Sequence, residues 1–152
     1  MIIIVIRPQL KQYLQHIPLS GIYLTEKYLM RIFKTRAFDR WATKIKLCNQ
    51  SLQQAITEIE LGQYEVNLGG SLYKKRIALG NKGKSGGARV IIAFKCENRA
   101  FFVYGFSKKQ KENTTLGELE ALKKLAKLYF AYTEEQIKNI LELKEFIEVE
   151  QL

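Results

Sequence analysis

The chain has 152 residues, of which 47% are hydrophobic and 11% aromatic, enough for one domain with a packed core and too apolar for a disordered chain. It has two cysteines, Cys48 and Cys96, and no CxxC pair, which excludes a disulfide framework and a cysteine-built zinc site of the usual spacing. Its formal net charge of +10 favours a polyanionic partner, such as nucleic acid, a ribosome, an acidic protein or an anionic membrane.

Residues 1–29 read as an N-terminal extension, because they hold the only histidine, His16, and show no sustained hydrophobic period. The apolar run at residues 2–6 is too short for a membrane span or for the apolar region of a secretory signal. We therefore expect a cytoplasmic protein. Met30 begins a segment typical of a domain start, so residues 1–29 are expected to lie upstream of a true start at Met30.

Two short antiparallel helices are predicted after an opening strand at residues 30–35. The first helix carries an apolar stripe at spacings of three and four. The second begins with the capping box Ser51-x-x-Gln54, and Gly62 is placed to end it. The first stripe consists of Phe38, Trp41, Ala42 and Ile45, and the second of Leu52, Ala55, Ile56 and Ile59.

Three strands are predicted next, at residues 72–79, 89–94 and 101–106. Their links are too short for parallel crossovers, so we expect an antiparallel meander. Period-two alternation in the first strand puts Leu72, Lys74, Arg76 and Ala78 on one face, and Tyr73, Lys75, Ile77 and Leu79 on the other. In the third strand it puts Phe102, Tyr104 and Phe106 on one face.

The C-terminal part is predicted to be mainly helical, with capping boxes at Thr115-x-x-Glu118 and Thr133-x-x-Gln136 and a terminal strand at residues 146–149. The stripe of the longer helix is Leu119, Leu122, Leu125, Ala126 and Tyr129. The fold class is therefore α+β, a small antiparallel sheet flanked by helices in the order β-α-α-β-β-β-α. We expect a main domain at residues 30–130 and a C-terminal helix and tail at 131–152.

The positive charge is concentrated in one quarter of the chain. Residues 74–111 contain eleven lysines and arginines and a single acid, Glu97. A surface that is only solvated normally mixes its charges, so a block of one sign within predicted strands favours a phosphate-binding face.

Three conventional kinds of site fit poorly. Gly83, Lys84 and Ser85 match the end of a nucleotide-binding loop, but Ala78 replaces its first glycine and a strand rather than a helix follows. No pair of carboxylates is placed for glycoside chemistry, and no cluster of His, Asp and Glu has metal-ligand spacing. A metal-dependent nuclease would need carboxylates among the basic strands, where the sequence shows none.

The remaining candidates are cations: Lys74 and Arg76 on one predicted strand, Arg89 on the next and Lys108 after the third. Such groups can cleave RNA without a metal. The ribose 2′-hydroxyl attacks the adjacent phosphorus, and the cations stabilise the charge that develops on the phosphate. A lysine whose pKa is lowered by neighbouring cations can also transfer a proton. The alternative is that the cations only bind RNA and the nearby aromatic residues belong to the core.

Several stretches at these positions resemble the RelE/HigB-like toxins of type II toxin–antitoxin systems, in the RelE/ParE superfamily. They are MRIFKTRAFDRWA from Met30, LGGSLYKKRIA (68–78), GKSGGARVIIAF (83–94), FFVYGFSKK (101–109) and ELEALKKLAK (118–127). The resemblance implies a small antiparallel sheet flanked by helices, without a metal or cofactor. It also implies cleavage of mRNA, commonly in the ribosomal A site, and neutralisation by an antitoxin within a toxin–antitoxin complex.

By position in these stretches, the resemblance implies catalytic roles for Lys74, Arg76, Arg89 and Lys108. RNA contacts are expected from Lys75, Lys82, Lys84, Tyr104, Lys109 and Lys111. The sequence departs from some relatives because no histidine and no C-terminal tyrosine stands in a clear catalytic place, which leaves the general base unassigned. Two other functions remain open: a ParE-like toxin that inhibits DNA gyrase without catalysis, and a plain RNA-binding module.

Overall fold

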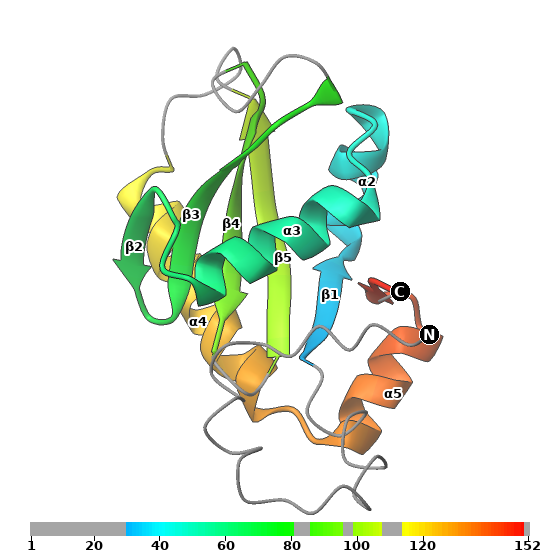
Figure 1. Cartoon of the computed structure of the whole chain (residues 1–152). Coiled ribbons are helices and arrows are strands. Elements are labelled where there is room, and N and C mark those ends of the chain that lie inside the picture. Colours follow the sequence, from blue (N-terminus) through cyan, green and yellow to red (C-terminus); the bar gives the residue numbers. More distant parts are fainter. Residues whose placement is uncertain (1–29, 81–85, 96–98, 108–113, 151–152) are drawn as a thin grey trace, which may run out of the picture.

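The computed structural model describes residues 30–80, 86–95, 99–107 and 114–150 (Figure 1). The proposed extension before Met30 and most of the loop that resembles a nucleotide-binding motif lie outside these ranges. So do five predicted site residues: Lys82, Lys84, Lys108, Lys109 and Lys111.

The described residues form a six-stranded sheet in the order β2-β3-β4-β5-β1-β6. The strands are β1 (Arg31–Thr35), β2 (Val66–Gly69), β3 (Leu72–Ile77), β4 (Ala88–Phe94), β5 (Arg99–Ser107) and β6 (Phe146–Glu148). This α+β fold confirms the predicted class, and β3, β4 and β5 form the expected antiparallel meander. Two features were not predicted: strand β2, and the parallel pairing of β1 with β5. The connection between β1 and β5 contains two helices, long enough for a parallel arrangement.

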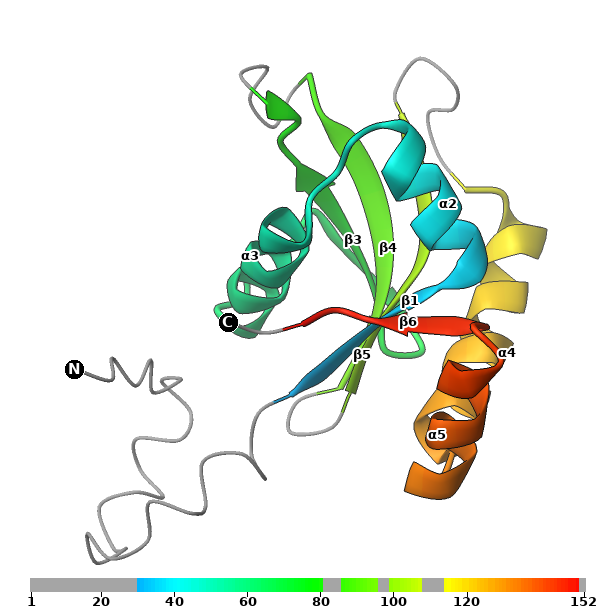
Figure 2. The same cartoon turned by 90° about the vertical axis from the view of Figure 1, so that its right-hand side faces the viewer.

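Helices cover both faces of the sheet. These are α2 (Arg36–Lys44), α3 (Asn49–Glu60), α4 (Leu116–Ala131) and α5 (Glu134–Glu142). Figure 2 shows α3 on one side of the sheet and α4 with α5 on the other. The predicted stripes of α2 and α3 pack into the core on the first side. On α4, Leu122 and Ala126 are buried, whereas Leu125 was wrongly assigned to the stripe and is exposed. None of the described helices is long and apolar enough to cross a membrane.

Two of the three capping boxes predicted from the sequence are present at helix N-termini. Thr115 and Thr133 form the two predicted capping boxes at α4 and α5. The box predicted at Ser51 is wrong, because α3 begins earlier, at Asn49, with Cys48 in the N-cap position and no side-chain cap bond. Ser51 lies in the first turn, where its hydroxyl is 3.3 Å from Cys48 Sγ. This hydrogen bond lowers the pKa of the Cys48 thiol.

Strand β5 contains a β-bulge, so the prediction that Phe102, Tyr104 and Phe106 share one face is wrong. Ile91 pairs with Tyr104 and Ile92 with Phe102, so Val103 has no partner in β4. The extra residue reverses the alternation. Phe102 therefore packs on the α2 and α3 side, 5.2 Å from the Phe38 ring, and does not share a face with Tyr104.

The C-terminal elements are held to the sheet by a group of ions that we name the C-terminal cluster: Arg31, Arg99, Glu134 and Glu148. Arg31 donates to both carboxylate oxygens of Glu148, at 2.8 and 2.9 Å, and to Glu134 at 2.8 Å. Arg99 donates to Glu134 at 2.5 Å and to the carbonyl oxygen of Tyr132 at 2.6 Å. The bond from Arg99 lowers the pKa of the Glu134 carboxyl. Two arginines and two carboxylates thus link β1 and β5 to α5 and β6.

Candidate functional site

Pairing of β3 with β4 gathers three of the predicted catalytic cations. Arg76 lies directly opposite Arg89, and Lys74 lies opposite Ile91, two residues along on each strand. Residues paired across two strands point to the same face, so Lys74, Arg76 and Arg89 share the face that α4 covers farther along. Lys74 and Arg89 are buried, whereas Arg76 is exposed.

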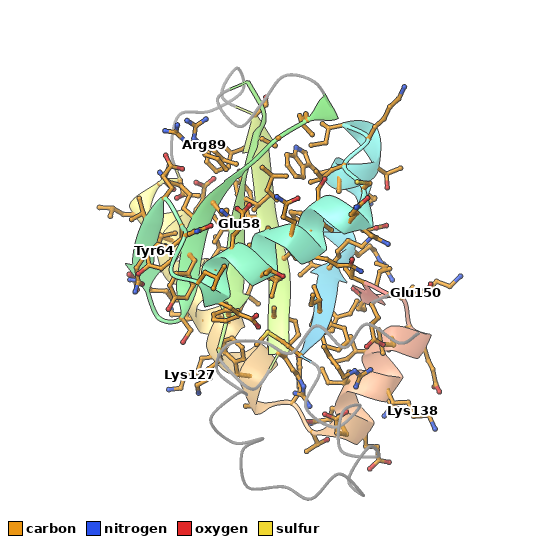
Figure 3. All side chains as sticks on the ribbon, in the orientation of Figure 1. Glu58, Tyr64, Arg89, Lys127, Lys138 and Glu150 are labelled. Carbon is orange, nitrogen blue, oxygen red and sulfur yellow. The ribbon has the colours of Figure 1, made fainter. Side chains whose placement is uncertain are left out.

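A carboxylate that sequence reasoning missed lies among these cations. Glu65 Oε1 is 3.1 Å from a terminal nitrogen of Arg76 and 3.9 Å from Lys74 Nζ. Its other oxygen, Oε2, is 3.6 Å from Arg89 Nε. We call these four residues the basic cluster. In Figure 3, Arg89 lies on the β2–β3 side of the molecule, away from Lys138 and Glu150.

The two oxygens of Glu65 differ in their surroundings. Oε1 accepts a hydrogen bond from Arg76, whereas Oε2 is buried and no donor among the described residues bonds to it. A buried carboxylate oxygen without a donor is costly, and in native proteins such a group calls for an explanation. Arg76 and Arg89 also lie directly opposite each other. Two like charges in this position destabilise a sheet, so the pair is a second local cost in stability. Both costs are typical of a site arranged for a ligand.

The turn between β2 and β3 brings Glu65 to this position. Val66 pairs with Lys74, and the Glu65 N–H donates to the Lys74 carbonyl at 2.9 Å. The basic strands β3, β4 and β5 contain no carboxylate, as the sequence shows, and the carboxylate at this site comes from the residue that precedes β2. The available signal was Gly69-Gly70, a dipeptide typical of hairpins, which together with Leu68 and Leu72 indicated a strand before β3.

The chain as a whole was compared with known families. A family model described as the RelE toxin of the RelE/RelB toxin–antitoxin system matches residues 30–149. The chain belongs to this family of RelE toxins. The family implies a cognate antitoxin as partner. The matched range includes α5 and β6 as well as the basic cluster. No curated protein matches the chain.

In this RelE toxin, Lys75 lies apart from Tyr104, the other predicted RNA contact within the described ranges. It points to the opposite face of β3, where its ammonium group forms an ion pair with Glu58 of α3. Both side chains are largely buried, at 6% and 13% exposure. Alternation along β3 causes this separation. Lys75 thus fixes α3 to the sheet.

Tyr104 lies beside the basic cluster. It pairs with Ile91, which places it on the same face as Lys74. Its side chain is half-buried, and its ring centroid is 5.9 Å from that of Phe106, which pairs with Arg89. Of the predicted site residues within the described ranges, Lys74, Arg76, Arg89 and Tyr104 are therefore brought to one face.

Proposed function

We propose that this RelE toxin is a metal-independent endoribonuclease that cleaves mRNA on the ribosome. The observation that carries the proposal is the basic cluster, in which cations from two adjacent strands surround one carboxylate, and one oxygen of this carboxylate accepts no hydrogen bond from the described residues. An excess of cations binds a phosphate, and a carboxylate among them can accept a proton.

The proposed reaction is an attack within the RNA strand. The Glu65 carboxylate takes the proton from a ribose 2′-hydroxyl, and the 2′-oxygen forms a bond to the adjacent phosphorus. The bond from phosphorus to the 5′-oxygen of the next nucleotide breaks, and that oxygen takes a proton from a cationic group, a role that we assign to Lys74 as the lysine of the basic cluster. The products are a 2′,3′-cyclic phosphate and a free 5′-hydroxyl, with no net change in charge or redox state.

The arginines supply the charge that such a step requires. Arg89 is held rigidly, because its side chain is 9% exposed, and it faces the same anion position as Arg76. Guanidinium groups fixed before the reaction stabilise the negative charge that develops on the non-bridging phosphate oxygens. These fixed cations take the part that a divalent metal plays in other nucleases.

The deciding experiment adds the purified toxin to translating ribosomes and maps the new mRNA ends. We expect Arg89→Ala to lower the cleavage rate by about a hundredfold or more, the scale for removing one preorganised donor, while ribosome binding is retained. The matched control is Arg40→Ala, which removes an exposed arginine of α2 outside the basic cluster.

Three results would contradict the proposal. Equal cleavage by Arg89→Ala and the parent would show that the basic cluster is not catalytic. No cleavage by the parent, combined with inhibition of purified DNA gyrase, would indicate a toxin of the gyrase-inhibiting type. Binding of RNA without any new ends would indicate a binding module.

A further inference from the structure

A shallow, open cavity of about 310 Å³ shares two residues with the basic cluster. It is lined by Gln63, Tyr64, Glu65, Lys75 and Arg76. Lys75 points to the α3 side of β3, whereas Glu65 and Arg76 belong to the basic cluster, so a molecule in the cavity lies beside β3 and contacts two members of this cluster. Binding pockets for small molecules usually measure roughly 300–1,000 Å³. This cavity is at the lower end of that range, where a single flat ring system fits better than a larger ligand.

Tyr64 provides an aromatic wall that is held in place from one side. Its ring centroid is 4.9 Å from that of Tyr73, which in turn packs edge-on against Phe94 at 5.9 Å. Tyr64 nevertheless remains 39% exposed. In Figure 3 it lies beside β2, on the same side of the molecule as Arg89. Exposed aromatic rings next to cations are the usual platforms on which single-stranded nucleic acids stack their bases.

Gln63 adds a polar group that is available to a ligand. Its backbone N–H donates to the carbonyl of Glu58 at 2.8 Å, which anchors the loop to the end of α3. Its side chain is exposed, and no hydrogen bond joins its amide to another of the described residues. A carboxamide offers both donors and an acceptor, the combination that reads the edge of an unpaired nucleobase.

We propose that this cavity binds the base of the nucleotide next to the scissile phosphate, with Tyr64 stacking on the base and Gln63 contacting its edge. The inference rests on the proposed function and adds a base-binding site to it. Since Tyr64 precedes Glu65 directly in the chain, one short loop supplies both the base platform and the proton acceptor. The ligand class is an unpaired base in a single RNA strand, because a paired base cannot expose both its face and its edge.

The test measures binding of a fluorescent oligonucleotide whose 2′-hydroxyls are replaced by hydrogen, so that cleavage cannot occur. We expect Tyr64→Ala to weaken binding roughly tenfold, the scale of one lost base stack. Tyr64→Phe keeps the ring and should bind like the parent. The control is Leu61→Ala, which removes a side chain that is 54% exposed but does not line the cavity.

A set of oligonucleotides that each lack one base identifies the contact. One abasic position should weaken binding to the parent by a similar factor, and Tyr64→Ala should then cause no further loss. If Tyr64→Ala weakens intact and abasic oligonucleotides equally, or binds like the parent, the base site is refuted. If Tyr64→Ala fails to fold, Gln63→Ala and the abasic series in the parent give the same decision, because absence of any abasic effect refutes the proposal.

The proposed function can fail separately from this site. Loss of cleavage in Arg89→Ala with no effect of Tyr64→Ala or of any abasic position rejects only the base site. A Tyr64 effect on binding, accompanied by full cleavage in Arg89→Ala, rejects only the catalytic assignment. Release of the oligonucleotide by an acidic peptide, with no abasic effect at any position, would show that the cavity serves a protein partner and would overturn the proposal.

Discussion

The two ion clusters of this toxin use the same residue types in opposite ways. In the C-terminal cluster two arginines meet two carboxylates, with donor–acceptor distances of 2.5–2.9 Å. In the basic cluster three cations share one carboxylate, at 3.1–3.9 Å. A balanced cluster with short, directed hydrogen bonds is suited to holding elements together. A cluster with excess positive charge and long contacts is suited to receiving an anion. This difference agrees with the proposal that the β3–β4 region acts on RNA while the β1–β6 region supports the fold.

Replacing one carboxylate by an amide in each cluster should give the largest difference between the clusters in their effect on the cleavage rate. We expect Glu65→Gln to lower the cleavage rate by about 10²–10⁴-fold, the range for loss of a general base, because an amide cannot take the proton. Glu134→Gln should leave the rate unchanged. Rates are to be measured at saturating substrate, with the thermal midpoint recorded for each variant. A Glu65→Gln protein with the parent's rate would show that Glu65 only pairs with its neighbouring cations.

Removing one arginine from the C-terminal cluster should mainly affect stability. Arg99→Ala deletes the donors to Tyr132 and Glu134, and we expect the free energy of unfolding to fall by roughly 1–2 kcal/mol. Urea unfolding measures this change. Cleavage well below the melting temperature should be unaffected. A loss of activity without a loss of stability would reverse the assignment of the two clusters.

The basic cluster was only partly predictable. Alternation along the predicted strand was enough to place Lys74 and Arg76 on one face, because this signal is local. Glu65 was missed because β2 has four residues and too little hydrophobic alternation to be recognised alone. The bulge at Val103 was also invisible, since one unpaired residue leaves no mark in a run of apolar side chains.

The C-terminal cluster was not predictable at all, for a different reason. It joins Arg31 to Glu148 and Arg99 to Glu134. No helical or strand period connects such distant positions, and only the tertiary arrangement of β1, β5 and β6 brings them together. Sequence periodicity reports which face a side chain occupies, and does not report which charge it meets there.

The salt dependence of RNA binding should also differ between variants of the two clusters, by a smaller amount than the effects above. Binding of RNA through phosphates weakens with salt because counterions are released. Arg76 is exposed and belongs to the basic cluster, so Arg76→Ala should reduce the slope of log affinity against log salt by about one. Affinities at several salt concentrations test this, with Arg31→Ala as the control. A slope unchanged by Arg76→Ala would mean that this guanidinium does not contact phosphate.

The smallest predicted effect concerns acid. The hydrogen bond from Arg99 lowers the pKa of Glu134 in the folded protein. A carboxyl with a lowered folded pKa adds stability that is complete above its unfolded value, about 4.3, and is lost as the pH falls through the folded pKa. The parent should therefore lose more stability than Glu134→Gln when the pH is lowered from about 5. Parallel curves of urea midpoint against pH for the two proteins would contradict this.

The position of β1 between β5 and β6 has a consequence for the order of folding. This strand is synthesised before all the others described, yet its neighbours in the sheet are β5 and β6, which begin at Arg99 and Phe146. Contacts between residues far apart in sequence form late, because a long loop must close first. The β3–β4 hairpin can form as soon as it leaves the ribosome, whereas the apolar faces of β1 must wait for most of the chain. The cations that we propose to be catalytic are thus assembled early, on a sheet that is completed last.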